Sequence, residues 1–143
     1  MSQNTTDRVA TSWQGFTDAL EGIPDGRMAE PGVAGDWSVK DLLGHVAFWE
    51  SRSVAHLDRE ARGEAHPDGD GTDFEQINQE QRQLRAGQTL ADARAEMQRT
   101  HAELVALLER VPSVDPDDIA GNTWEHYDEH AENIRAWRKR EGI

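Results

Sequence analysis

The chain has 143 residues, of which 28 are Asp or Glu and 15 are Lys or Arg, so its formal net charge at pH 7 is −13. So acidic a surface repels polyanions, and the composition therefore predicts that nucleic acid is not a partner. The absence of cysteine excludes disulfides, thiolate metal ligands and a cysteine nucleophile. The length fits one domain over residues 1–143 with a sizeable core. No apolar run is long enough to cross a bilayer, and the N-terminal residues lack a signal-peptide pattern, so we expect a cytoplasmic protein without a membrane partner.

Two long amphipathic helices are predicted in the first half of the chain. The first spans about residues 5–21, where an apolar stripe recurs at three- and four-residue spacing and consists of Val9, Trp13, Phe16 and Leu20. Asp41 stands three residues after Ser38, which predicts a capping box and a second helix that runs to about Arg62. On the helical wheel of this second helix, His45 points toward the core.

The middle of the chain predicts a connection followed by one short and one long helix. Residues 63–73 are polar and rich in glycine, and a capping box that begins at Thr72 opens the short helix, which Gly87 interrupts. Thr89 then caps a third long helix that ends near Arg110, with an inward stripe made of Leu90, Ala93, Met97, Leu104, Val105 and Leu108. No stretch shows the alternation typical of a β-strand.

Residues 122–137 predict the fourth main helix, and they contain His126 and His130 four positions apart. Because an α-helix turns by roughly 100° per residue, these two side chains share one face about 6 Å apart. The wheel places them on the inward arc together with Asn133 and Trp137. Two imidazoles at this spacing can share a metal ion. With four amphipathic helices and no strand, the sequence predicts an all-α four-helix bundle.

Three inward histidines, His45, His126 and His130, are therefore candidate metal ligands. Helices packed about 8–10 Å apart can bring such rings to one ion, and three protein ligands leave a position for water or substrate. An ion with an open position activates water near neutral pH, which is typical of a catalytic site. The alternative is that each ring is a core histidine with its own hydrogen-bond partner, as we expect for His101. His56 follows His45 by eleven residues, about 16 Å along a straight helix, and cannot reach the same ion.

The segment Trp37–Glu50, together with the later His126-x-x-x-His130, resembles the DinB/YfiT-like superfamily of metal-binding four-helix bundles. The segment Thr-Trp-Glu-His-Tyr-Asp-Glu-His is similar to the corresponding segment of the ClbS/DfsB-like subgroup, which is related to the mycothiol-dependent maleylpyruvate isomerase N-terminal domain. By matching position, the resemblance implies that His45 joins the pair as a ligand. It also implies an up-down-down-up bundle, with residues 63–88 as the crossover that carries the short extra helix, and a homodimer. The residue spacing alone leaves open whether the second and fourth helices run parallel or antiparallel.

The family includes S-transferases that use bacillithiol, mycothiol or glutathione, an isomerase, and a hydrolase that inactivates a cyclopropane-bearing toxin. The resemblance therefore implies an enzyme that uses a divalent ion, zinc or nickel, to act on a small-molecule substrate. Activated water would make it a hydrolase, and a low-molecular-weight thiol from outside would make it a thiol transferase, since the chain has no cysteine. Two alternatives remain: a bundle that binds or sequesters a small ligand, and a structural bundle with core histidines.

Four further side chains stand near the predicted centre. Trp49 and Trp137 are expected either to line a substrate pocket or to be plain core aromatics. Glu50 falls near the apolar arc of its helix and is either a general base beside an activated water or a boundary residue in a salt bridge. Arg52 lies on the side of His45, where it would steer an anionic ligand or else extend along the surface.

Overall fold

The computed structural model describes residues 2–64 and 73–143, and residues 1 and 65–72 lie outside this description. In the described ranges the chain is helical throughout and has no strand, apart from an isolated β-bridge between Ala34 and Trp37. The elements are α1 (Ser2–Leu20), η1 (Asp25–Arg27), α2 (Val39–Ala61), α3 (Phe74–Leu84), α4 (Leu90–Arg110), α5 (Pro116–Ile119), η2 (Ala120–Asn122) and α6 (Trp124–Glu141). The predicted all-α class is confirmed. None of the described helices is long and apolar enough to cross a membrane.

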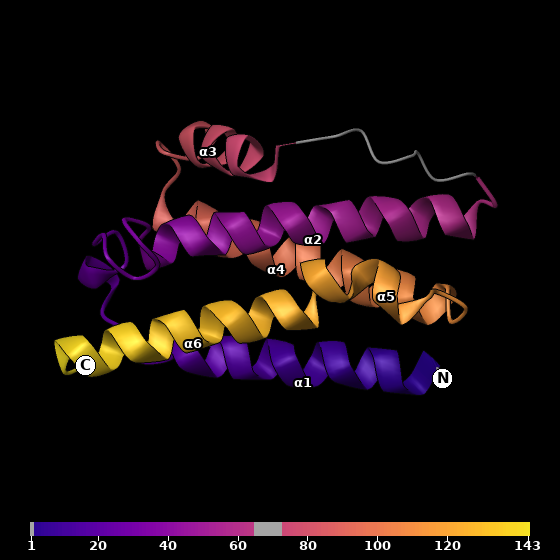
Figure 1. Cartoon of the computed structure of the whole chain (residues 1–143), viewed down its shortest axis with the longest axis horizontal. Helices are drawn as coiled ribbons and strands as arrows, with labels where there is room; N and C mark the ends of the chain where they lie inside the picture. The colour runs from indigo at the N-terminus through magenta and orange to yellow at the C-terminus, as the bar shows by residue number, and fades with distance from the viewer. Residues whose placement is uncertain (1, 65–72) are drawn as a thin grey trace.

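The four long helices lie side by side in an up-down-down-up order. Figure 1 shows that α1 and α6 run in one direction and that α2 and α4 run in the other. α1 packs mainly against α6, and α2 packs mainly against α4. The implied topology is thereby confirmed, and α2 and α6 are antiparallel, which the residue spacing had left open. The short helix α3 lies outside the bundle, along α2, on the crossover between α2 and α4.

The starts of α2 and α4 are fixed by local sequence. The backbone N–H of Asp41 donates to Ser38 Oγ over 3.1 Å, and the Ser38 N–H donates to an Asp41 carboxylate oxygen over 2.9 Å. Thr89 Oγ1 accepts the N–H of Asp92 over 3.1 Å in the same way. A cap of this kind stabilises a helix by about 1 kcal/mol. The predicted caps of both helices are therefore confirmed.

The inward faces of the long helices meet in one core. Its fully buried side chains are mainly large and apolar, and they include Phe16, Leu42, Leu43, Leu57, Leu104 and Ile134. Each such side chain contributes about 1.5–3 kcal/mol when it leaves water. The buried face of α6 is more polar, because His126 and His130 lie in it beside Tyr127 and Trp137.

The short helix α3 departs from the prediction in its start, and it packs outside the core. Its N-cap is Asp73, whose carboxylate accepts the N–H of Gln76 over 3.2 Å. The predicted cap at Thr72 lies one residue earlier, outside the described residues. None of the α3 side chains is buried, and Phe74 and Leu84 are 63% and 76% exposed. α3 is therefore an outer layer, which contacts Trp49 of α2 through both the Phe74 ring and the polar side chain of Asn78.

The helix α5 was not predicted, although the sequence carries its signal. The Asp115 carboxylate accepts the N–H of Asp117 over 3.0 Å, and Pro116 occupies the first turn, where a missing N–H costs little. α5 continues through η2 into α6. This path brings Gly121 and Asn122 to the start of the helix that carries the histidine pair.

Candidate metal centre

A cluster of three histidines lies between α2 and α6. His45 comes from α2, and His126 and His130 come from successive turns of α6. Each can offer one ring nitrogen such that the three atoms lie within 4.8 Å of one another. The Nε2 atoms of His45 and His126 are 2.9 Å apart, and the three ring centroids are separated by 4.5 to 5.0 Å. Within residues 2–64 and 73–143, these three form the one group of this kind.

One nitrogen of His130 has a fixed partner in its own helix. Its Nδ1 lies 3.0 Å from Oδ1 of Asn133, three residues later. When the ring donates its Nδ1–H to this oxygen, Nε2 carries the lone pair, and this is the form in which imidazole binds a metal. Asn133 therefore orients the His130 ring toward the cluster.

Burial keeps the three imidazoles neutral. Burial and the neighbouring His130 lower the pKa of His45 to about 4, and burial with both neighbours lowers the pKa of His126 to about 2. Burial also lowers the pKa of His130, against the opposing effects of Asn133 and Glu129. Near pH 7 each ring therefore keeps a lone pair for a cation.

The unpartnered ring nitrogens and their spacing indicate whether a metal ion fits the cluster. Neither His126 Nδ1 nor His130 Nε2 has a hydrogen-bond partner, although both atoms are buried. Leaving such an atom unpaired costs about 1–3 kcal/mol. A tetrahedral zinc ion with bonds of about 2.0–2.1 Å would space its nitrogens by roughly 3.3 Å, which lies between the closest and the widest separations in the cluster. Three neutral imidazoles therefore form a donor set that fits a divalent ion such as zinc or nickel.

Two cavities lined by described residues contact both His45 and His130. The larger is an open pocket of about 360 Å³, referred to below as the main pocket, and its lining comprises His45, Trp49, Phe74, Asn78, Gly121, Asn122, His126, Glu129 and His130. The smaller, of about 140 Å³, lies between the start of α2 and α3 and contacts His45, His130 and Asn78. A small molecule can therefore approach the histidines directly.

Trp49 and Arg52 lie next to each other on α2. Trp49 lines the main pocket, and its Nε1–H donates to Asn78 Oδ1 over 2.7 Å. The guanidinium of Arg52 lies over the Trp49 ring at 5.6 Å and over the Phe48 ring at 6.0 Å. Arg52 is not part of the lining of the main pocket.

Trp137 does not lie where a substrate-pocket role requires. Its side chain is 2% exposed and packs in the core, with the Arg27 guanidinium 5.7 Å from its ring centre. Seven residues separate it from His130, which is about 10 Å along the helix axis. The structure thus corrects the pocket prediction, and Trp137 takes the alternative role of a core aromatic.

Glu50 is placed in the core and not beside the pocket. Its side chain is fully buried, one carboxylate oxygen accepts hydrogen bonds from the Tyr127 hydroxyl and from His101 Nδ1 at 2.8 Å, and the Trp13 ring stacks on His101 at 3.7 Å. Burial and the Glu50 carboxylate raise the pKa of Tyr127, so its hydroxyl stays a donor. This network joins four helices, and it replaces the predicted general-base role of Glu50. His101 is a partnered core histidine, as predicted.

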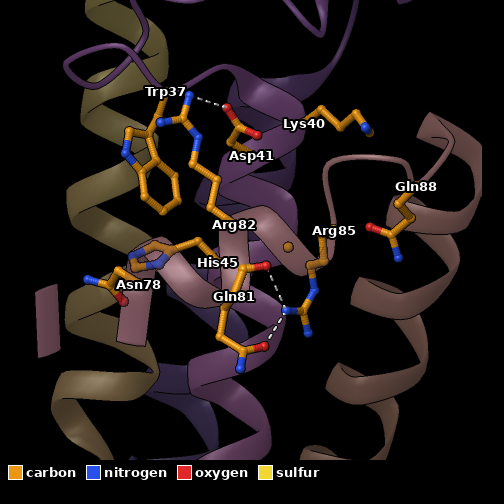
Figure 2. Close-up of a pocket in the computed structure, with 10 residues that line it drawn as sticks. Trp37, Lys40, Asp41, His45, Asn78, Gln81, Arg82, Arg85 and Gln88 are labelled. Carbon is orange, nitrogen blue, oxygen red and sulfur yellow. Dashed lines mark hydrogen bonds and ion pairs between the residues drawn. The ribbon is translucent and has the colours of Figure 1, made fainter. Parts of the chain in front are cut away.

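The sequence did not indicate the polar face that α3 turns toward α2. Figure 2 shows four side chains of this face around His45, namely Asn78, Gln81, Arg82 and Arg85. These positions are spaced i, i+3, i+4 and i+7, so a polar stripe at helical spacing was the available signal. Asn78 lines three cavities that each include His45, and the other three residues of the stripe line one of them, so α3 is part of the site.

Ion pairs hold α3 in this place. Arg82 lies 3.1 Å from a carboxylate oxygen of Asp36 and 3.3 Å from one of Asp41. Arg85 makes two bonds to Glu96 on α4, of 2.7 and 3.0 Å. Its side chain passes over Gly44 so closely that a Cβ there would lie 2.6 Å from Arg85 Cδ.

Comparisons with known proteins agree with this fold. A protein from Escherichia coli UTI89, solved as an uncharacterised protein, is 18% identical, with a TM-score of 0.83 over 100% of this chain and 95% of that one. The colibactin self-resistance protein ClbS, solved in complex with a dsDNA, is 19% identical, with a TM-score of 0.79 over 96% of this chain and 95% of that one. No curated protein matches the sequence.

The ClbS complex contradicts one prediction. Net charge led us to exclude nucleic acid, yet a bundle of the same fold is seen with dsDNA. That exclusion is wrong, because a net charge sums over the whole surface and does not describe any one face. The family resemblance itself is confirmed: ClbS is among the neighbours in fold, and the model of the DinB superfamily matches residues 8–137. The chain belongs to the DinB superfamily.

Proposed function

We propose that the protein is a divalent-metal-dependent enzyme that acts on a small molecule, with His45, His126 and His130 as the ligands of a zinc or nickel ion. The supporting observation is that three neutral imidazoles, with buried nitrogens that lack partners, converge at an open pocket. Such an ion supplies Lewis acidity and lowers the pKa of a water or thiol that reaches it.

The surrounding side chains bind, orient and accept protons. Trp49 and Phe74 form an aromatic wall, with ring centroids 5.6 Å apart, against which an apolar part of a substrate can pack. Glu129 lines the same pocket, and its carboxylate lies 4.0 Å from His130 Nε2. From there it can accept the proton of an attacking water or thiol, which is the role that Glu50 cannot fill.

Two reactions fit this arrangement. In hydrolysis, the oxygen of water bonds to the electrophilic atom, the bond from that atom to the leaving group breaks, and the leaving group receives one proton of the water. In thiol transfer, the sulfur of an external thiol bonds to the electrophilic atom, the bond from that atom to the leaving group breaks, and the leaving group receives the thiol proton. The thiol must come from outside because the chain has no cysteine.

Turnover of a panel of small electrophiles, with and without low-molecular-weight thiols, tests the proposal. Zinc- or nickel-loaded protein should convert at least one electrophile, and metal-stripped protein should not. Glu129→Gln should slow conversion by about 10²-fold or more, whereas Glu132→Gln, an exposed α6 control, should not. Binding of electrophiles without any conversion would instead identify a sequestering bundle.

Double-stranded DNA is a second candidate ligand, because ClbS was solved with a dsDNA. Binding should weaken steeply with salt if it rests on phosphate contacts. Fluorescence anisotropy of a labelled duplex, titrated at low salt and at about 150 mM salt, measures this. An anisotropy that stays flat at low salt rules the candidate out.

A further inference from the structure

Asn78 occupies a special place on α3. It lines the main pocket, the smaller cavity and the narrow cleft under α3, and each of these also includes His45. Figure 2 shows its amide beside the imidazole of His45. Its neighbours Arg82 and Arg85 on the same face are engaged by carboxylates, but Asn78 has no charged partner among the described residues.

The hydrogen bond from Trp49 fixes how this amide points. The indole N–H can only donate, so the atom that it meets at 2.7 Å must be the amide oxygen. The Asn78 Nδ2 group therefore faces away from Trp49, and its two N–H donors have no acceptor among the residues that the structure describes. An oriented donor with no protein partner is available to a ligand.

The helix that carries Asn78 is held rigidly enough to make the donor useful. Arg85 ties α3 to Glu96 on α4, and Arg82 ties it to the loop before α2 through Asp36. A donor that is fixed before the ligand arrives contributes more than one that must be ordered on binding.

We propose that Asn78 is a ligand-positioning residue whose Nδ2–H donates to an oxygen acceptor of the molecule bound at the histidine cluster. The inference rests on the proposed metal centre and narrows its substrate class. The substrate carries a carbonyl-type or carboxylate oxygen beside the reacting atom, and an apolar part that packs on Trp49 and Phe74. The Glu129 carboxylate can only accept hydrogen bonds, and the Nδ1 of His130 is already paired with Asn133, so the side-chain amide of Asn78 adds a donor to this lining.

Cobalt-loaded protein allows a test by binding alone, because the visible spectrum of Co²⁺ reports its ligands. The probe is acetohydroxamate, which presents oxygen acceptors, and the control probe is imidazole, which presents no acceptor to Asn78 once it binds a metal. The variants are Asn78→Ala, which removes the donor without adding charge, and Asn78→Asp, which removes the donor but keeps an oxygen for Trp49. The indole N–H resonance of Trp49 checks that Asn78→Asp retains that bond.

Both variants should weaken acetohydroxamate binding by about ten-fold and leave imidazole binding within about two-fold, as expected for one lost hydrogen bond. Weakening in Asn78→Ala alone would make the residue only an anchor for α3, and weakening in Asn78→Asp alone would be a charge effect. Either of these results, or unchanged acetohydroxamate binding in both variants, overturns the inference about Asn78 and leaves the proposed metal centre unaffected. A wild-type protein that gives no cobalt spectrum overturns both.

Discussion

The buried network around Glu50 makes a quantitative prediction for Tyr127→Phe. The substitution removes one hydroxyl and changes the shape of a fully buried ring very little. It deletes one of the two hydrogen bonds that a Glu50 oxygen accepts, and the bond from His101 remains. A hydrogen bond to a charged group contributes about 1.5–3 kcal/mol, so the free energy of unfolding should fall by about 2 kcal/mol. For 143 residues the unfolding entropy is roughly 0.3 kcal/mol per kelvin, which lowers the melting temperature by about 7 °C.

Urea unfolding followed by circular dichroism measures this change, with an unchanged slope as the sign that the unfolded states are comparable. A double-mutant cycle with Glu50→Gln should give a coupling energy of about 1 kcal/mol or more, because the two side chains touch. Zinc content should stay the same in all variants. A stability loss below about 0.5 kcal/mol, or a loss of zinc without a loss of stability, would refute the structural role assigned to Glu50.

Three further predictions concern α3 and the core. Arg85 lowers the pKa of Glu96, so this ion pair contributes its full stabilisation above the unfolded-state pKa near 4.5 and loses it as the pH falls through the lower folded-state pKa. The difference in unfolding free energy between wild type and Glu96→Gln should therefore become smaller on acidification. A difference that does not change with pH contradicts this prediction. Gly44→Ala should not raise the free energy of unfolding by the roughly 1 kcal/mol that alanine usually contributes over glycine in a helix, because the new Cβ meets Arg85. An increase of that full size in urea unfolding would mean that Arg85 moves away freely. Trp137→Phe should change the affinity of the cobalt protein for acetohydroxamate by less than about two-fold, because Trp137 is a core residue. A loss of about ten-fold would indicate that Trp137 does contact the ligand.

The histidine pair could be predicted because its geometry is local. His126 and His130 share a face through i, i+4 spacing alone, and the caps at Ser38 and Thr89 likewise depend on a few neighbouring residues. The meeting of His45 with the pair depends on how two distant helices pack. Residue spacing does not determine whether α2 and α6 run parallel or antiparallel, and the family resemblance supplied that information.

The errors at the site have two physical causes. A helical wheel reports angle but not height, so Trp137 shared the direction of His130 while lying two turns away from it. A helical wheel also does not show partners on other helices. It therefore placed Glu50 near the inward face but could not indicate its hydrogen bonds to His101 and Tyr127. Asn78 was missed because it stands on a helix that buries no side chain, and the sequence does not distinguish its polar face from ordinary solvent-exposed surface.

The central claim is that His45, His126 and His130 hold one divalent ion. Elemental analysis of zinc-loaded, dialysed protein tests it most directly, with His126→Ala as the variant and His56→Ala, eleven residues from His45 on α2, as the matched histidine control. We expect one ion per chain in the wild type and in the control, and none in His126→Ala, whose helical circular dichroism should be unchanged. A wild type without zinc, or a His126→Ala protein that keeps its zinc, would contradict the claim.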